Sequence, residues 1–497
     1  MPESVPPLGP ARLPDATSRG AHAHPVWPLV EAALAAALSF VSAFVIARIV
    51  GPAELGIGAA AVAVAVLLWV AVNALFADPL TQSATTDPRE LSAAFWAATG
   101  FGVLAALVQA ACGPLLAMLL DDARLIPMCL ALALPLPLVG AAGAMQGLLT
   151  RARRYDVLAA RVIIGQGLGT VVGIVLALRG AGGWALVAQQ VATAGIGALL
   201  LLARAGWRPI LAWRTAPVRD MLRIGLPITA SVLAQLGRYR LFLLLVGGML
   251  GPAALGQLHL AFRLVDTVRE LLATALWRLL LPALSDQRDD LAALATAMEQ
   301  ALRLSAVALF PLCGLLLVGM EPLVRLLLGP GWGSSAEAGA PLVGLLVWTI
   351  LAFAANVAAV TRGGARIALI VQLGSLGLTL AALLAWPPET PAQAVWIWVG
   401  AQAVMLPWMA WRTALLLELP ITRLYQAGLP ALAGSGIAAL AALALSPGVA
   451  DAGASALAVL GQRVGIFTLI YAPIALFLLR GLSWESLRAD GVPDAAD

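Results

Sequence analysis

Charged side chains interrupt two consecutive apolar stretches near the middle of the chain. The first stretch contains Arg238 and Arg240. The second contains a histidine, two further arginines and two carboxylates, namely His259, Arg263, Asp266, Arg269 and Glu270. At 100° per residue, a helix would place all of these five except Arg269 on one stripe. That stripe must face water or a charged partner, because a charge is costly in apolar surroundings.

The four arginines of this cluster outnumber its two carboxylates. A guanidinium binds phosphate oxygens through paired hydrogen bonds and keeps its charge. One hypothesis is therefore an anion clamp for a phosphate or diphosphate group, with the arginines as Arg238, Arg240, Arg263 and Arg269. The alternative is a structural ion-pair network, in which Arg263, Asp266 and Glu270 pair within one helix. Arg238 and Arg240 differ by 200° in helical phase, so we do not expect both to face one cavity.

The rest of the sequence offers little other chemistry. All 30 residues of the Lys+Arg set are arginine, which excludes a Walker A phosphate loop and Schiff-base catalysis, since both need a lysine. Cys112, Cys129 and Cys313 lie in apolar runs, and no set of His, Cys and carboxylate residues has the spacing of a zinc site. We therefore expect a protein that is not an enzyme, with no metal, cofactor or nucleic-acid partner.

The elements that must position the charged cluster are membrane spans. The 497-residue chain is 61% apolar and only 11% charged, whereas soluble proteins are about a quarter charged. A membrane helix needs about 20 mostly apolar residues, and the sequence predicts an all-α polytopic membrane protein with fourteen transmembrane helices. They lie at about 29–49, 55–77, 93–120, 125–149, 157–178, 183–203, 222–248, 253–281, 301–328, 339–361, 366–386, 392–416, 426–446 and 457–480.

The arginine distribution predicts the orientation of these spans, because cytoplasmic loops are enriched in Lys and Arg. If residues 1–28 form a disordered cytoplasmic head, the alternating loops place 21 arginines on the cytoplasmic side and five on the outer side. Arg161 counts among the cytoplasmic arginines, and Arg124 and Arg463 count among the outer ones. Both termini, including a tail at 481–497, are then expected in the cytoplasm.

An internal repeat divides the spans into two halves. Residues 51–56 (Gly-Pro-Ala-Glu-Leu-Gly) recur as residues 251–256 (Gly-Pro-Ala-Ala-Leu-Gly), and two weaker repeats follow at similar offsets. Each pair occupies the same point of a six-span unit, which predicts two parallel six-helix lobes related by a pseudo-two-fold axis. The predicted parts are an N-lobe at 29–204, a cytoplasmic linker at 205–221, a C-lobe at 222–417 and two accessory helices at 426–480.

Duplicated membrane folds of this kind bind substrate between their halves, which open to each side in turn. The sequence therefore predicts a transporter that works by alternating access. The predicted external loops are short, and the longest lies at about 328–339. Short external loops disfavour polymerases and ligases that need a large external domain.

Several motifs resemble the oligosaccharide flippases of the Wzx type, the polysaccharide-export branch of the superfamily that also holds lipid II flippases and multidrug extruders. As they stand in this chain, the motifs are residues 47–56 (ARIVGPAELG), 91–96 (LSAAFW), 183–188 (GWALVA), 223–227 (RIGLP), 250–256 (LGPAALG) and 321–329 (EPLVRLLLG). Their order and spacing extend the resemblance over residues 30–420.

The resemblance implies export of a polyprenyl-diphosphate-linked oligosaccharide across the bacterial inner membrane, for synthesis of exopolysaccharide, capsule or O-antigen. The implied partners are this substrate, membrane lipids and the polymerase of the same pathway, and the flippase itself would be a monomer. The family often has an Asn/Asp pattern in the seventh span, where this chain has Arg240, Leu241 and Phe242. That departure leaves Asp266 and Glu270, with His259, as candidates for coupling to an ion gradient.

Two other functions remain as alternatives. A drug or toxin extruder of the same fold would need a negative or aromatic cavity, whereas the charged cluster predicts a positive one. A membrane polymerase or ligase of the same pathway would need larger external loops.

Overall fold

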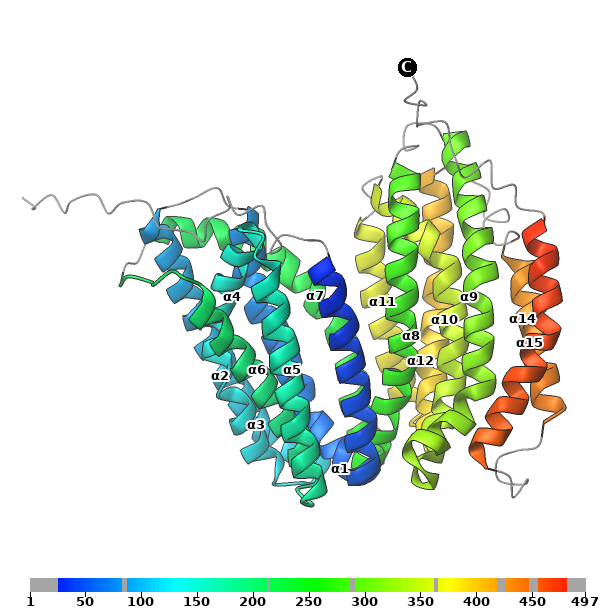
Figure 1. The fold of residues 1–497 in the computed structure, drawn as a ribbon, viewed down its shortest axis with the longest axis horizontal. Helices are drawn as coiled ribbons and strands as arrows, with labels where there is room; N and C mark the ends of the chain where they lie inside the picture. The colour runs from blue at the N-terminus through cyan, green and yellow to red at the C-terminus, as the bar shows by residue number, and fades with distance from the viewer. Residues whose placement is uncertain are drawn as a thin grey trace, which may run out of the picture. The chain divides into compact units, whose positions relative to one another are not determined.

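In the computed structural model of the protein, the described residues are almost entirely helical (Figure 1). The structure describes residues 26–82, 87–211, 215–285, 291–361, 365–417, 426, 428–446 and 455–480. No strand occurs in these ranges. The predicted head at 1–28 lies outside them except for its last three residues, and the predicted tail at 481–497 lies wholly outside them.

The helices follow the predicted spans along the chain. Their bounds are α1 (Val26–Gln82), α2 (Pro88–Leu120), α3 (Leu125–Ala133), α4 (Leu136–Arg151), α5 (Tyr155–Leu178), α6 (Trp184–Arg204), α7 (Thr215–Leu250), α8 (Pro252–Ser285), α9 (Leu291–Leu328), α10 (Gly333–Thr361), α11 (Ala365–Ala385), α12 (Pro391–Leu417), α14 (Leu429–Ala444) and α15 (Ala456–Arg480). Every predicted span overlaps a helix, with α1 covering the first two spans and α3 with α4 covering the fourth. Within the described ranges, nine helices are long and apolar enough to cross a membrane. The count of fourteen spans stays a prediction.

The repeated Gly-Pro motif begins a new helical segment at both of its positions. Gly51 has a φ of 79° and interrupts the helical backbone of α1. Gly251 has a φ of 89° and separates the end of α7 from Pro252, the first residue of α8. Glycine adopts positive φ without steric penalty, and proline suits the first turn of a helix, where an N–H would have no partner. The same residue pair thus produces the same break twice.

The two copies of this motif also pack against each other. The backbone of Gly56 lies against the carbonyl oxygen of Pro252, and the backbone of Gly256 lies against the carbonyl oxygen of Pro52. A Cβ atom at either glycine would overlap the facing oxygen. The contact is therefore reciprocal: the proline carbonyl oxygen of each copy packs against the second glycine of the other copy.

The helices group into two units, Met1–Leu260 and Ala261–Asp497. In the first unit, α7 packs along α1, and Gly225 of α7 lies against the carbonyl oxygen of Leu75. The division between the units falls within α8, later in the chain than the predicted linker at 205–221. The predicted lobe boundaries stay a prediction.

Each unit has its own apolar core. In the first unit, α1, α2 and α4 bury a cluster that includes Leu80, Leu91 and Met145. In the second unit, α14 and α15 lie beside α9 (Figure 1), and this group buries Phe467 and Tyr471, whose rings stack with centroids 5.8 Å apart. The predicted accessory helices are therefore part of the second unit, where apolar contacts pack them against α9.

A charged corner joins three turns of the first unit. Glu54, just after the Gly51 break, accepts a hydrogen bond from Nη1 of Arg124 at 3.0 Å and one from the backbone N–H of Gly183 at 2.8 Å. Arg124 also donates from Nη2 to Asp122 at 2.8 Å. The hydrogen bond from Arg124 lowers the pKa of Asp122, although partial burial opposes that shift, and the bond to Asp122 raises the pKa of Arg124. These contacts connect the α1 break with the α2–α3 and α5–α6 turns.

Candidate functional site

Three of the predicted site residues lie in the first unit. Arg238 and Arg240 on α7 and His259 on α8 are all partly buried. The guanidinium carbon of Arg240 lies 5.2 Å from the ring centroid of Tyr239, within the range of a cation–π contact. Such a contact offsets part of the cost of holding this charge away from water.

The other four predicted site residues lie on α8 in the second unit. Arg263 and Asp266 are partly buried, whereas Arg269 and Glu270 are exposed. Asp266 forms an ion pair with Arg269, three positions further along the helix, with an N–O distance of 2.9 Å. This pair has the i,i+3 spacing that favours ion pairs on a helix. Its arginine, Arg269, is the residue of the α8 group that we did not expect on the polar stripe. Because the seven residues are divided between the two units, a single cavity containing all of them stays a prediction.

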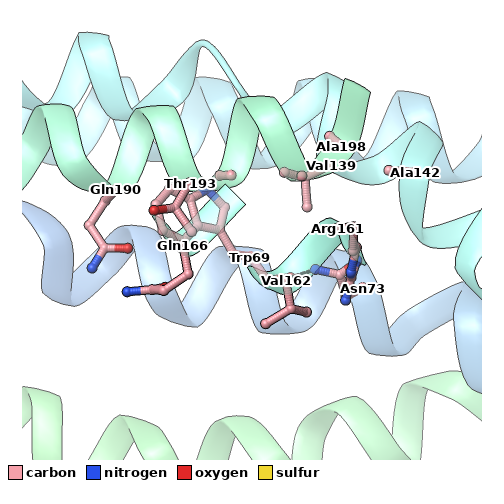
Figure 2. Close-up of a pocket in the computed structure, with 12 residues that line it drawn as sticks. Trp69, Asn73, Val139, Ala142, Arg161, Val162, Gln166, Gln190, Thr193 and Ala198 are labelled. Atoms are coloured by element: carbon pink, nitrogen blue, oxygen red, sulfur yellow. Dashed lines mark hydrogen bonds between the residues drawn. The ribbon is translucent and has the colours of Figure 1, made fainter. Parts of the chain in front are cut away.

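The first unit contains a polar pocket that the sequence did not predict. A cavity of about 210 Å³ lies between α1, α4, α5 and α6. Its polar lining consists of two residues from each of three helices, namely Trp69 and Asn73 from α1, Arg161 and Gln166 from α5, and Gln190 and Thr193 from α6. Figure 2 shows Gln190 and Gln166 toward one end of the pocket, and Arg161 and Asn73 toward the other. The pocket therefore extends along the helix bundle, with amide groups at both ends.

Glycines determine how closely α5 and α6 approach each other beside this pocket. Gly165, Gly169 and Gly173 recur every four residues on α5, and a Cβ atom at each would lie 2.8–3.2 Å from a backbone carbonyl oxygen of α6. Small residues at this spacing allow membrane helices to pack closely. Arg161 lies one step earlier on the same stripe of α5. The repeated Gly-x-x-x-Gly spacing, preceded by an arginine, is the sequence signal that indicates this site.

Several polar atoms that line the pocket have no partner among the described residues. They are Nε1 of Trp69, Oδ1 of Asn73 and Oγ1 of Thr193, and all three are buried. The amide nitrogen of Asn73 donates to the carbonyl oxygen of Trp69 at 3.0 Å, which determines the orientation of that amide. Buried polar groups in proteins are normally hydrogen-bonded, so an unpaired set in one pocket indicates a ligand or water.

Arg161 is the charged residue of this pocket. The count of arginines in the predicted loops assigns Arg161 to the cytoplasmic side, although residue 161 lies within the predicted span 157–178. The structure places it about two turns into α5, on the wall of the pocket, where Glu31 of α1 is its electrostatic partner. An arginine of this kind inside a membrane helix is a candidate for ligand contact.

The fold is that of known membrane transporters. It matches the lipid II flippase MurJ in an inward closed conformation with a TM-score of 0.73 and 12% identity, over 92% of this chain and 99% of that one. It matches an inward-facing multidrug resistance MATE family transporter of the MOP superfamily with a TM-score of 0.60 and 15% identity, over 78% of this chain and 99% of that one. The predicted all-α, multi-pass membrane fold is thereby confirmed.

The sequence comparisons agree with this fold. The succinoglycan biosynthesis transport protein ExoT of Rhizobium meliloti is 24% identical over 322 residues, and the match spans 64% of this chain and 64% of that relative's length. The family model described as "Polysaccharide biosynthesis protein" matches residues 45–337, more than half of the chain. The matched region includes both copies of the Gly-Pro motif, the pocket and the charged cluster. The predicted resemblance to a polysaccharide-export family is confirmed, and this chain belongs to the polysaccharide biosynthesis protein family.

Proposed function

We propose that this protein is a flippase that moves a polyprenyl-diphosphate-linked oligosaccharide from the inner to the outer leaflet of the bacterial inner membrane. The observation that carries the proposal is the set of partly buried arginines in long helices of a chain from the polysaccharide biosynthesis family. An arginine within a membrane span is costly unless it faces water or an anionic partner, so such residues mark a substrate path. The related transport protein of succinoglycan biosynthesis supports this class of substrate.

In this proposal, the charged cluster binds the head group of the substrate. The arginines of the proposed diphosphate clamp are Arg238, Arg240, Arg263 and Arg269. Arg238 and Arg240 differ by 200° in helical phase, so only one of these two would face the phosphate groups in a given state. Asp266, with Glu270 and His259, adjusts the charge of the clamp or couples transport to an ion gradient. The ion pair between Asp266 and Arg269 agrees with such a role, because a carboxylate beside a clamp arginine competes with the phosphate oxygens for it.

The proposed architecture has fourteen spans, with two six-helix lobes, two accessory helices and both termini in the cytoplasm. The lobes open to each side in turn, as duplicated transporters do. The reciprocal packing of Gly56 on Pro252 and of Gly256 on Pro52 supports the pseudo-two-fold relation. The protein would act as a monomer, with its lipid-linked substrate, membrane lipids and the polymerase of the pathway as partners.

A leaflet assay tests the proposal in cells that lack the wild-type gene. A membrane-impermeant reagent added from outside should find lipid-linked oligosaccharide in the outer leaflet only when the protein is present. Arg263→Ala should abolish that signal while the protein still inserts, and Arg263→Lys should retain part of it, because the charge remains but the paired hydrogen bonds do not. Arg325→Ala, at the end of α9, is the matched control and should transport normally.

Different outcomes separate the proposal from its alternatives. An outer-leaflet signal that persists after deletion would overturn the flippase function, and normal output from Arg263→Ala would overturn the clamp. A deletion that raises drug sensitivity and leaves polysaccharide intact would indicate a drug extruder. Accumulation of translocated but unpolymerised units would indicate a polymerase or ligase.

A further inference from the structure

The pocket between α1, α4, α5 and α6 is separate in its residues from the proposed diphosphate clamp. It lies within the first unit, and none of the seven residues of the charged cluster lines it. Its unpaired atoms are Nε1 of Trp69, Oδ1 of Asn73 and Oγ1 of Thr193 among the described residues. Leaving such groups unpaired is unfavourable, so the pocket is suited to a molecule that pairs with them.

The chemistry of the three atoms restricts what that molecule can be. The indole N–H of Trp69 can only donate a hydrogen bond, the Oδ1 atom of Asn73 can only accept one, and the hydroxyl group of Thr193 can do both. The amide of Asn73 cannot be reversed without loss, because its nitrogen donates to a backbone carbonyl oxygen. An anion would be repelled by Oδ1 of Asn73, which is an acceptor, and a cation would be repelled by the indole N–H of Trp69, which is a donor. A molecule with several hydroxyl groups satisfies all three.

The remaining lining residues agree with a neutral polyhydroxyl ligand. The carboxamides of Gln166 and Gln190 each combine donors with an acceptor, which suits pairs of neighbouring hydroxyl groups. Glu31 of α1 lies within electrostatic range of Arg161, so the pocket has a negative charge near its positive one. The aromatic body of Trp69 adds an apolar surface beside these polar groups.

The volume of the pocket limits the size of the group that it can hold. A volume of about 210 Å³ is below the roughly 300–1,000 Å³ of pockets for drug-sized molecules. That space suits one six-membered sugar ring, and the rest of a longer molecule would extend outside the pocket.

We infer that this pocket binds one neutral hexopyranose ring of the transported glycan. The inference rests on the proposed flippase function, to which it adds a sugar-recognition subsite in the first unit. Trp69, Asn73 and Thr193 provide the hydrogen bonds that an incoming ring completes, and Gln166 and Gln190 bind its outer hydroxyl groups.

Saturation-transfer NMR on the purified full-length protein tests this inference. The probes are the methyl glycosides of glucose, galactose and mannose, whose methyl group occupies the position of a glycosidic bond. At least one should bind, and Thr193→Val and Trp69→Phe should each weaken its binding about fivefold, because each removes one hydrogen-bonding group; Thr193→Val keeps the side-chain shape, and Trp69→Phe keeps an aromatic ring. Thr170→Val is the matched control, since the Thr170 hydroxyl group is also buried and unpaired among the described residues but does not line the pocket.

The outcomes distinguish the subsite from the flippase function. Binding of none of the three glycosides, an equal loss in Thr170→Val, or displacement of the glycoside by inorganic phosphate would overturn the subsite. Normal transport of lipid-linked oligosaccharide by Thr193→Val and Trp69→Phe would also overturn it and would leave the flippase function intact. Glycoside binding that depends on these residues, without any wild-type transport, would support the sugar site and overturn the flippase function.

Discussion

Two arginines at similar helical positions have opposite surroundings in the two units. Arg161 lies about two turns into α5 of the first unit, and Arg463 lies about two turns into α15 of the second. Arg463 is 5% exposed and donates to the Ser446 hydroxyl group at 3.1 Å, to the Val318 carbonyl oxygen at 3.1 Å and to Glu321 at 3.3 Å. Arg161 instead lines a pocket.

The difference shows how the partners of a buried charge indicate its role. The bonds of Arg463 connect α15 with α9 and with Ser446, two residues beyond the end of α14, so its guanidinium holds the accessory helices in place. Around Arg161, three polar atoms lack a partner among the described residues. A charge whose donors are used within the protein stabilises the fold, whereas a charge among unpaired groups is positioned for a ligand.

The largest expected effect is on stability, for Arg463→Ala. Removal of one partner of a buried ion pair costs about 3–5 kcal/mol, and we expect about 3 kcal/mol here, because the Glu321 side chain is 37% exposed and can regain water. Thermal unfolding of the purified protein in detergent measures this loss. An unchanged unfolding temperature would contradict a structural role for Arg463.

The second effect is on transport, for Arg161→Gln. A hydrogen bond to a charged group contributes about 1.5–3 kcal/mol, so transport in the leaflet assay should fall about 10- to 100-fold while the unfolding temperature stays near that of the wild type. Arg154→Gln is the matched control, since Arg154 precedes α5 and pairs with Asp156 outside the pocket. If Arg161→Gln destabilised the protein as much as Arg463→Ala does, the contrast between the two arginines would be lost.

A smaller effect on stability is expected for Ser446→Ala. This change removes one acceptor of Arg463 and should cost about 1 kcal/mol. In the double variant with Arg463→Ala, the serine change should cost less than it does alone, because its partner is already absent. Unfolding measurements on the single and double variants give this coupling, and fully additive losses would show that the bond contributes nothing.

The sequence predicts the helices well and the pocket poorly, for a physical reason. Apolar runs and the Gly-Pro breaks at 51–52 and 251–252 are local properties, since the bilayer requires about 20 apolar residues and a positive φ favours glycine. The direction in which Arg161 points depends on the rotation of α5 against α6, which the packing of Gly165, Gly169 and Gly173 determines. Counting arginines in loops could not separate Arg161 from Arg463, because the count uses only positions along the chain and not the groups that each side chain meets in space. The glycines that follow Arg161 at every fourth position are the local difference between the two.

The smallest effect is expected for a third arginine, Arg124, which is well hydrogen-bonded but 48% exposed. Arg124→Ala should cost only about 0.2–1 kcal/mol, and less in high salt, because exposed ion pairs are screened. Asp122 has a lowered pKa when folded, so its contribution is present above about pH 4 and is lost as the pH falls through that lowered pKa. Unfolding at neutral and acid pH, in low and high salt, tests this. A large loss of unfolding free energy that does not depend on salt would show that an exposed arginine with hydrogen-bond partners stabilises the fold as much as we expect of the buried Arg463.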